Sequence, residues 1–262
     1  MLMNAAQLKG LTVRTTDGEI GSVEQFYFDD ETWALRYLIV DTGGWLGGRR
    51  VLISPISVIS ADWQARRLDV ALTKSQVENS PDINTQLPVS RQNEAEYMGY
   101  YGYPYYWGGP NLWGTELYPA GLAVPMAVPV APVQKQSVDS HLRSSDEVTG
   151  YHMEASDGEI GHLDGFILDE EAWSVRYIEV ATRNWWPGKK VLLSPGWIEK
   201  VSWPESRVYV GVSREAIING PEYTAGTPIT RDYERQLYFH YGRPPYWALD
   251  AEQKDAVALG GI

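Results

Sequence analysis

The sequence predicts a mainly β fold, with two small antiparallel β-barrels in tandem, each followed by short helices and an aromatic-rich tail. Two observations support this prediction. Residues 8–107 align without a gap on residues 148–247, and a repeat of this length is a duplicated domain, since solenoid repeats span about 20–50 residues. Each copy also contains several short strand patterns separated by turn signals, which is typical of a barrel or sandwich.

The repeat divides the chain into four expected segments. They are a first repeat with a helical aromatic tail (residues 1–107), a linker rich in Pro, Gly and Ala (108–140), a second repeat with its own tail (141–250) and a C-terminal tail (251–262). Two copies of roughly 100 residues each match the usual domain size. The linker is nearly uncharged, so we expect it to pack on the barrels or on a partner.

The strands come first in each copy. Their patterns cover residues 11–16, 20–28, 33–40, 51–53, 57–60 and 68–72, and they recur between residues 151 and 212. Asp17-Gly18 predicts a hairpin turn of type I′, in which both central residues have positive φ. The glycine-rich segment 43–48 lacks the Lys-Ser/Thr ending of a phosphate loop. It therefore predicts a flexible hairpin loop with Trp45 at its tip.

Short helices follow the strands. Polar residues that favour helix N-caps precede four helical patterns, ending near residues 79, 97, 219 and 239; these residues are Thr73, Ser90, Ser213 and Thr230. Glu94 and Glu234 lie in the first turn of the second helix of each copy, where a negative charge is favourable. Both of these helices run into tails rich in Tyr, Gly, Pro and Trp.

Composition excludes several classes of function. The net charge of −12 disfavours direct binding to phosphate backbones and anionic lipid surfaces. The absence of cysteine excludes disulfides, thiolate metal sites and cysteine nucleophiles. The N-terminus does not resemble a signal peptide, and no window is apolar enough for a membrane helix. We therefore expect a soluble, cytoplasmic chain with no membrane span of its own.

The residues that could carry chemistry form no recognisable site. The histidines at positions 141, 152, 162 and 240 have no partner at metal-ligand spacing and are interpreted as isolated. The acidic runs 29–31 and 169–171 lack the glycine and spaced oxygens of a calcium loop, so they are interpreted as turns. No nucleophile motif is present. We expect no catalytic residue, no metal and no cofactor, and hence no enzyme.

The strand-rich halves resemble the PRC-barrel family. The resemblance is carried by Gly10, Asp17-Gly18-Glu19-Ile20-Gly21, Arg36-Tyr37-Leu38-Ile39-Val40 and Val51-Leu52-Ile53-Ser54-Pro55, and it recurs at Gly150, 157–161, 176–180 and 191–195. It covers about 70 residues of each copy. It implies the fold already expected, a barrel that serves as a docking surface and not as a catalyst.

Two settings of this family suggest functions. One is the cytoplasmic domain of the H subunit of photosynthetic reaction centres, and the other is the C-terminal domain of the ribosome-maturation factors. Bacterial stand-alone and tandem versions also exist. The resemblance therefore implies a scaffold or accessory subunit, and in its sharpest form an extrinsic cytoplasmic subunit of a reaction-centre complex. Such a subunit would lie at the inner membrane only through other proteins. The alternatives are a ribosome or RNA-processing assembly factor and a stand-alone stress-related protein.

The aromatic tails are the candidate protein interface. Tyr and Trp combine a large apolar body with a polar group, and they are enriched in interface hot spots. The tail pattern Tyr-Gly-x-Pro-x-Tyr-Trp occurs in both copies, outside the part that resembles the family. The alternative is that each run packs back on its own barrel. The candidates are Tyr97, Tyr100, Tyr101, Tyr103, Tyr105, Tyr106, Trp107, Trp113, Tyr118, Tyr241, Tyr246 and Trp247.

Overall fold

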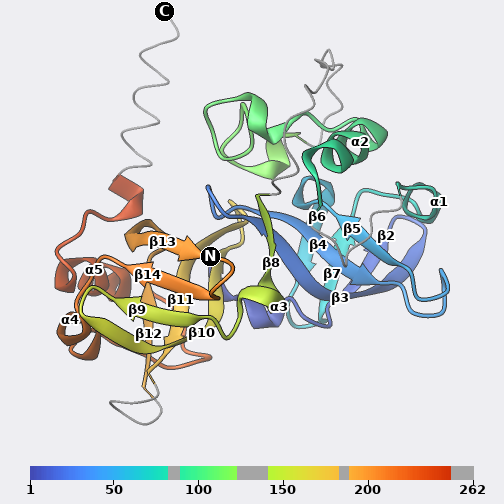
Figure 1. The fold of residues 1–262 in the computed structure, drawn as a ribbon. Helices are drawn as coiled ribbons and strands as arrows, with labels where there is room; N and C mark the ends of the chain where they lie inside the picture. The colour runs from blue at the N-terminus through green and yellow to red at the C-terminus, as the bar shows by residue number, and fades with distance from the viewer. Residues whose placement is uncertain (82–88, 123–140, 183–188, 249–262) are drawn as a thin grey trace, which may run out of the picture. The chain divides into compact units, whose positions relative to one another are not determined.

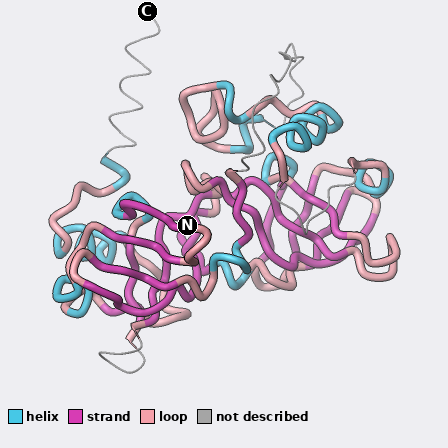
Figure 2. The backbone as a smooth tube through the Cα atoms, in the orientation of Figure 1, coloured by secondary structure: helices cyan, strands magenta, loops and turns pink. Residues whose placement is uncertain are grey.

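The structure is a computed structural model that describes residues 1–81, 89–122, 141–182 and 189–248. The chain forms two compact units that do not coincide with the sequence repeats. The first unit comprises residues 1–149 and 165–176, and the second comprises residues 150–164 and 177–262. Strands make up most of the ordered structure in each unit (Figure 2). The tip of a hairpin from the second repeat thus belongs to the first unit.

The first repeat closely follows the predicted order of strands and helices (Figure 1). Its elements are β1 (Leu2–Asn4), η1 (Ala5–Gln7), β2 (Thr12–Thr15), β3 (Gly18–Asp29), β4 (Leu35–Asp41), β5 (Arg50–Ile53), η2 (Pro55–Ser57), β6 (Val58–Asp62), β7 (Arg67–Val70), α1 (Lys74–Glu78), α2 (Arg91–Tyr101), η3 (Tyr106–Gly108) and η4 (Pro119–Leu122). The sequence patterns missed the short strand β1.

The second repeat has the same order of strands. Its elements are β8 (Leu142–Ser144), α3 (Ser145–Val148), β9 (His152–Ala155), β10 (Gly158–Asp169), β11 (Ser174–Ala181), β12 (Lys190–Leu193), η5 (Pro195–Trp197), β13 (Ile198–Ser202), β14 (Arg207–Val210), α4 (Arg214–Ile218), β15 (Glu222–Tyr223) and α5 (Arg231–His240). The strands β8 and β15 were not predicted. The four expected N-caps are confirmed, since each cap side chain accepts a backbone N–H from the first turn of its helix.

The strands form two mixed sheets. One has the order β5-β4-β3-β2-β7-β6, with β8 also paired to β3, and the other has the order β13-β14-β9-β10-β11-β12-β15, with β1 also paired to β10. The β2–β7 and β9–β14 pairs are parallel. The mainly β architecture is therefore confirmed. Closed barrels are not confirmed, because the described strands of each sheet form an open path.

The Asp-Gly-Glu-Ile-Gly motif has a different structural role from the one expected. The β2–β3 hairpin forms, with Thr15 opposite Gly18, but Asp17 does not adopt positive φ, so the type I′ prediction is wrong. Instead, the Asp17 carboxylate accepts hydrogen bonds from the Thr15 hydroxyl and the Lys74 backbone N–H. Gly21 is required because a Cβ atom there would lie 2.0 Å from the Asp41 carbonyl oxygen, at a φ of +145°. Gly161 repeats this close approach.

Within the first unit, the short strands at the start of each repeat pair in a reciprocal way. The strand β1 lies antiparallel to residues 167–169 at the end of β10, with Leu2 opposite Asp169. The strand β8 lies antiparallel to residues 27–29 at the end of β3, with Leu142 opposite Asp29. These two pairings are related by the 140-residue offset of the repeat. Each hairpin tip therefore receives the leading strand of the other repeat.

The turns of the two hairpins meet in the same reciprocal manner. Ala34 and Ser174, which are equivalent positions, form an antiparallel bridge. The Leu35 N–H donates to the Trp173 carbonyl oxygen, and the Val175 N–H donates to the Trp33 carbonyl oxygen, both at 2.8 Å. Such self-complementary contacts define an isologous interface. The first unit thus contains a local pseudo-two-fold arrangement of the tips 26–36 and 166–176.

An aromatic cluster fills the space between these tips. The ring of Phe166 lies 5.6 Å from both Phe26 and Phe28, edge-on to the first. All three side chains are buried. Aromatic pairs at this distance contribute beyond the area they bury. The hairpin tip from the second repeat is therefore part of the hydrophobic core of the first unit.

The helix α2 and the segment that follows it pack on the first sheet. Figure 1 shows α2 over one end of the strands β4–β6. The Tyr97 hydroxyl donates to the Leu52 carbonyl oxygen and accepts from the Ser54 N–H. The described part of the predicted linker, residues 108–122, belongs to the first unit, where Trp113 and Leu122 are buried. The rest of that linker, residues 123–140, lies outside the described residues.

We predict that Phe166→Ala destabilises the first unit. Truncating a buried phenylalanine to alanine costs about 3–5 kcal/mol. Amide hydrogen exchange should therefore accelerate in Phe26 and Phe28, although these residues lie in the other repeat. Phe239→Ala is the control, because Phe239 is 90% exposed and surface substitutions usually change stability by less than about 0.5 kcal/mol. Faster exchange confined to residues 150–164 and 177–248 would contradict the packing described.

Candidate functional site

The most distinctive feature of the first unit is the buried side chain of Arg36. Arg36 lies on β4, and only 1% of its side chain is exposed. Its guanidinium lies 3.5 Å from the Asp29 carboxylate and donates to the Thr32 hydroxyl at 3.1 Å. Asp29 ends β3, so the β3–β4 turn supplies both partners. A buried charge is stable only when it is paired and hydrogen-bonded.

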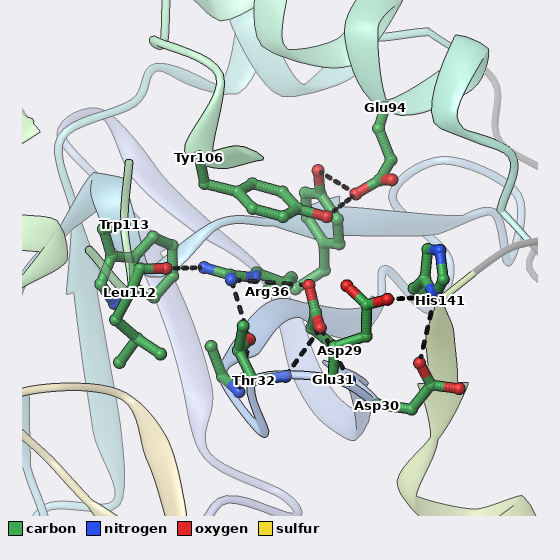
Figure 3. Close-up of polar contacts among 12 residues, drawn as sticks. Asp29, Asp30, Glu31, Thr32, Arg36, Glu94, Tyr106, Leu112, Trp113 and His141 are labelled. Atoms are coloured by element: carbon green, nitrogen blue, oxygen red, sulfur yellow. Dashed lines mark hydrogen bonds and ion pairs between the residues drawn. The ribbon is translucent and has the colours of Figure 1, made fainter. Parts of the chain in front are cut away.

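The segment after α2 completes the surroundings of this guanidinium (Figure 3). The Leu112 carbonyl oxygen accepts a hydrogen bond from Arg36 at 2.7 Å. The guanidinium carbon lies 3.7 Å from the centre of the Tyr106 ring and 4.9 Å from that of Trp113. A cation over an aromatic face is stabilised most when water is excluded. Arg36 therefore holds the tail segment through both rings and backbone.

A tight turn presents Trp113 to this site. The turn is held by reciprocal backbone hydrogen bonds between Asn111 and Gly114. Gly114 has a φ of +81°, and its carbonyl group lies so close to Gly109 that a Cβ atom on Gly109 would be 2.3 Å from the carbonyl oxygen. The indole of Trp113 is fully buried, and its Nε1–H donates to the Ala172 carbonyl oxygen at 2.9 Å.

A second buried acid connects α2 to the same segment. Glu94 is 3% exposed and accepts hydrogen bonds from the hydroxyls of Tyr37, at 3.3 Å, and Tyr106. Arg91, one helical turn earlier, lies 3.3 Å from the Glu94 carboxylate. Burial raises the pKa of Glu94 to about 7, while Arg91 and the Tyr106 hydroxyl act in the opposite direction. Glu94 on α2 is thus hydrogen-bonded both to β4, through Tyr37, and to the tail, through Tyr106.

The second repeat contains an equivalent network within the second unit. Glu234 accepts hydrogen bonds from the hydroxyls of Tyr177, at 2.8 Å, and Tyr246, at 3.0 Å. Arg231 lies 3.0 Å from the Glu234 carboxylate. The position equivalent to Trp113 is Gln253, which lies outside the described residues. The acid–tyrosine network is therefore present twice, whereas the tryptophan occurs in one repeat alone.

The acidic turns have the role predicted for them. The Asp29 carboxylate accepts the backbone N–H groups of Glu31 and Thr32, and Asp169 accepts those of Glu171 and Ala172. Asp30 instead lies 2.7 Å from Arg143. These side chains stabilise the turns in the manner typical of Asx turns.

The histidines are not all isolated, which corrects the prediction. His141 lies 3.3 Å from the Asp30 carboxylate (Figure 3). The register of β9 and β10 places His152 opposite His162, with ring centres 4.7 Å apart. Sequence spacing could not show this pair, because the residues meet across two strands. His240 lies with its Nε2 2.7 Å from the Ala216 carbonyl oxygen. Because a carbonyl oxygen can only accept, Nε2 is the donor of this hydrogen bond.

The structure places the candidate interface rings at three depths. The buried rings are Tyr97, Tyr106 and Trp113, and the exposed rings are Tyr100 and Tyr118. The half-buried rings are Tyr101, Tyr103, Tyr105, Trp107, Tyr241, Tyr246 and Trp247. The half-buried rings of the first tail pack against a core cluster that includes Tyr37 and Tyr97. Two pairs are stacked, Tyr101 on Tyr103 and Tyr105 on Trp107. The first tail therefore contains both rings that pack on the core of its own unit and rings that are exposed to solvent.

The sequence patterns did not identify Asp29, Arg36 and Glu94 as parts of one site. A signal for them was present, because the acid, the arginine and the glutamate all recur 140 positions later, as Asp169, Arg176 and Glu234. The involvement of Leu112 had no signal, since a backbone carbonyl can belong to any residue type.

Comparison with known families identifies the strand-rich part of this site. Residues 1–76 match the model of the PRC-barrel domain. The chain contains a PRC-barrel domain. No curated protein matches the chain. The PRC-barrel domain supplies Asp29, Arg36 and Tyr37, whereas Glu94, Tyr106 and Trp113 come from beyond the matched residues. The site therefore combines residues inside the matched domain with residues that follow it in the chain.

One further property concerns membranes. Among the described residues, no helix combines the length and the apolar character needed to span a bilayer.

We predict that Glu94→Gln changes how stability depends on pH. The pKa of Glu94 is about 7 in the folded chain, against an ordinary value of 4.5. Folding therefore favours the protonated acid, and this contribution is complete below pH 4.5 and is lost as pH rises through 7. The free energy of unfolding of the unmodified chain should fall by up to about 3 kcal/mol over this window.

Urea unfolding between pH 4.5 and 8 checks this prediction. The Glu94→Gln variant should lack most of the slope. Glu96→Gln, which changes an exposed acid on the same helix, should keep it. An unchanged slope in the Glu94→Gln variant would contradict the assignment.

Proposed function

We propose that this protein is a non-enzymatic scaffold or accessory subunit that binds other proteins through the aromatic tail of its first repeat. The observation that carries the proposal is the pre-ordered array of half-buried rings on that tail. Tyr105 and Trp107 are stacked with ring centres 4.7 Å apart, and the Arg91 guanidinium lies 4.4 Å from the Trp107 ring centre. Rings already fixed in place lose little entropy on binding.

The chemistry of the site supports a binding role. Its buried acids, Asp29 and Glu94, bond to arginine, tyrosine and backbone groups. Such a network fixes a structure, whereas a general acid or base must be within reach of a substrate. PRC-barrel domains generally mediate protein interactions. We also propose that the second repeat is a domain of the same type, because its strands occur in the same order.

A sharper form of the proposal is an extrinsic subunit at the cytoplasmic face of a photosynthetic reaction-centre complex. Its support is the resemblance of the barrel to the H-subunit domain. Co-purification with pigmented membranes is the expected result. An RNA-associated assembly factor is the alternative, and the net charge of −12 disfavours it. RNA affinity that falls steeply with salt would favour that alternative.

We predict that the double variant Tyr105→Ala/Trp107→Ala loses its partner without losing its fold. Hot-spot rings each contribute about 2 kcal/mol or more to binding, so recovery of the partner should fall at least about tenfold. The measurement is affinity purification of the tagged full chain from its source cells, with quantitative mass spectrometry. Tyr209→Ala is the control, because Tyr209 is half-buried and lies outside both tails.

Thermal unfolding of the same variants separates binding from folding. Tyr106 is left intact because it is buried and its loss would disturb the core. Equal recovery by the double variant and the control would reject the tail as the binding surface. A double variant that unfolds at room temperature would assign these rings to the core instead.

A further inference from the structure

The rings of the first tail differ in whether the fold uses their polar groups. Four of them form hydrogen bonds within the first unit through a hydroxyl or an indole N–H, namely Tyr97, Tyr100, Tyr106 and Trp113. In the described part of the chain, no hydrogen bond involves the Tyr105 hydroxyl or the Trp107 indole N–H. Neither atom is among the buried polar atoms that lack a partner there, and both side chains are partly exposed. These two donors are therefore left to solvent or to a ligand.

The two rings that carry these donors also form a stacked pair. The planes of Tyr105 and Trp107 are 12° apart, with ring centres 4.7 Å apart. The indole of Trp107 also contacts the Arg91 guanidinium at 4.4 Å. Among the described residues, the ring of Tyr105 has no aromatic or cationic neighbour other than Trp107. Tyr105 therefore has one face that no other ring or cation of the described chain covers.

The backbone holds the pair in place. Tyr106, between the two rings, is buried, and its hydroxyl contacts Glu94 and Arg91. The Tyr105 carbonyl oxygen accepts a hydrogen bond from the Gly108 N–H at 3.3 Å. A ligand therefore meets rings that are already ordered, so that little conformational entropy is lost on the protein side.

The surroundings of the pair are uncharged. Residues 97–115 contain no Asp, Glu, Lys or Arg. The charge of Arg91 is matched within the fold, because its guanidinium lies 3.3 Å from the Glu94 carboxylate. A charged ligand would lose its hydration here without gaining an opposite charge. The ligand that fits this surface is therefore uncharged.

The hydrogen-bonding groups on offer also select the ligand. An indole N–H can only donate, and a tyrosine hydroxyl can donate, so a ligand rich in acceptors and poor in donors is favoured. A proline residue has no backbone N–H, and the polyproline II helix leaves its carbonyl groups without internal partners. A sugar, by contrast, brings several hydroxyl donors, and residues 97–115 have no carboxylate to accept them.

The second tail lacks this combination. Trp247 is equivalent to Trp107, and the Arg231 guanidinium lies 4.2 Å from its ring centre. The residue equivalent to Tyr105 is Pro245, which has neither an aromatic face nor a hydroxyl. The stacked pair with two unused donors thus belongs to the first tail, and Trp247 provides a matched control for it.

We propose that Tyr105 and Trp107 bind an uncharged, proline-rich segment of a partner protein in the polyproline II conformation. The two donors bond to carbonyl oxygens of the segment, and a proline ring packs on the uncovered face of Tyr105. This inference rests on the proposed function, since it uses the same rings, and it adds the chemistry by which the partner is recognised. Aromatic surfaces bind proline-rich segments in this way in several unrelated domains.

The probe is fluorescein-labelled decaproline, titrated with the full-length protein up to about 1 mM while anisotropy is followed. Saturable binding with a Kd on the order of 10–300 µM is expected, because both the rings and the peptide are ordered before they meet. Trp107→Ala should weaken binding at least about tenfold. Tyr105→Phe, which keeps the ring and removes the donor, should weaken it about two- to tenfold. Trp247→Ala should leave it unchanged.

Changes to the probe keep the test independent of protein folding. A labelled Gly-Ser peptide of the same length is uncharged and has backbone N–H groups in place of proline rings, and it should not bind. Absence of saturable decaproline binding, or binding that is insensitive to both ring substitutions, would overturn the proposal. Displacement of decaproline by cellohexaose would assign the rings to a sugar and would also overturn it.

Deleting residues 123–133 tests another source of the same chemistry. This segment of the chain has three prolines and no charge, and it lies outside the described residues. Unchanged decaproline affinity after the deletion supports a partner as the occupant. Binding that appears only after the deletion would assign the rings to the chain's own segment and overturn the proposal.

The proposal and the proposed function can fail separately. If decaproline does not bind, but the Tyr105→Ala/Trp107→Ala variant still loses its partner, the rings are the binding surface and the ligand has a different chemistry. If that variant keeps its partner, the tail is not the binding surface, whatever the decaproline titration shows.

Discussion

The structure of the first unit depends on the burial of one charge, the guanidinium of Arg36. Removing an arginine from water costs several kcal/mol unless its charge and donors are matched. Asp29 and Thr32 supply part of that match from the same hairpin, but they leave the face of the guanidinium to be covered. Tyr106 and Trp113 cover that face, and the Leu112 carbonyl accepts a further hydrogen bond, while the buried Nε has no hydrogen-bond partner among the described residues. The segment after α2 must therefore return to the first sheet, and the half-buried rings between α2 and Trp113 are held in place by this requirement.

The reciprocal packing of the hairpin tips explains why the site lies where it does. The Trp113 indole donates to the carbonyl of Ala172, a residue of the other repeat, so the site around Arg36 is complete only when the tip 166–176 is in place. That tip is fixed by the Phe26–Phe166 contact, by the Ala34–Ser174 bridge and by β1. The repeated sequence thus supplies within one chain the two halves of an isologous interface, which a single copy could obtain only from another molecule.

Much of the fold could be predicted from the sequence, because the strands and helix caps depend on local patterns. Thr73 and Ser90 are capping residues wherever a helix follows them, and both begin helices here. The strand β1 was not predicted, because three residues are too few to show the alternation of a strand. Its pairing partner is also far away in the sequence, since Leu2 lies opposite Asp169 and Asn4 lies opposite Ile167. The pairing of His152 with His162 and the contact of Arg36 with Leu112 also depend on register or backbone. The sequence shows where the Tyr and Trp residues of the tail lie, but not which of them are buried, because burial depends on tertiary contacts such as that of Tyr106 with Arg36.

Comparison of the two repeats separates what the fold requires from what was added to it. Glu94 contacts one arginine and two tyrosines, and Glu234 contacts the equivalent arginine and tyrosines of the second repeat. This network therefore belongs to the docking of the second helix in either copy. Trp113 has no equivalent, yet β9–β14 form the same strands as β2–β7. The turn 111–114 is therefore not needed to form the strands. Its burial against Arg36 instead covers a guanidinium that the β3–β4 turn alone leaves partly uncovered.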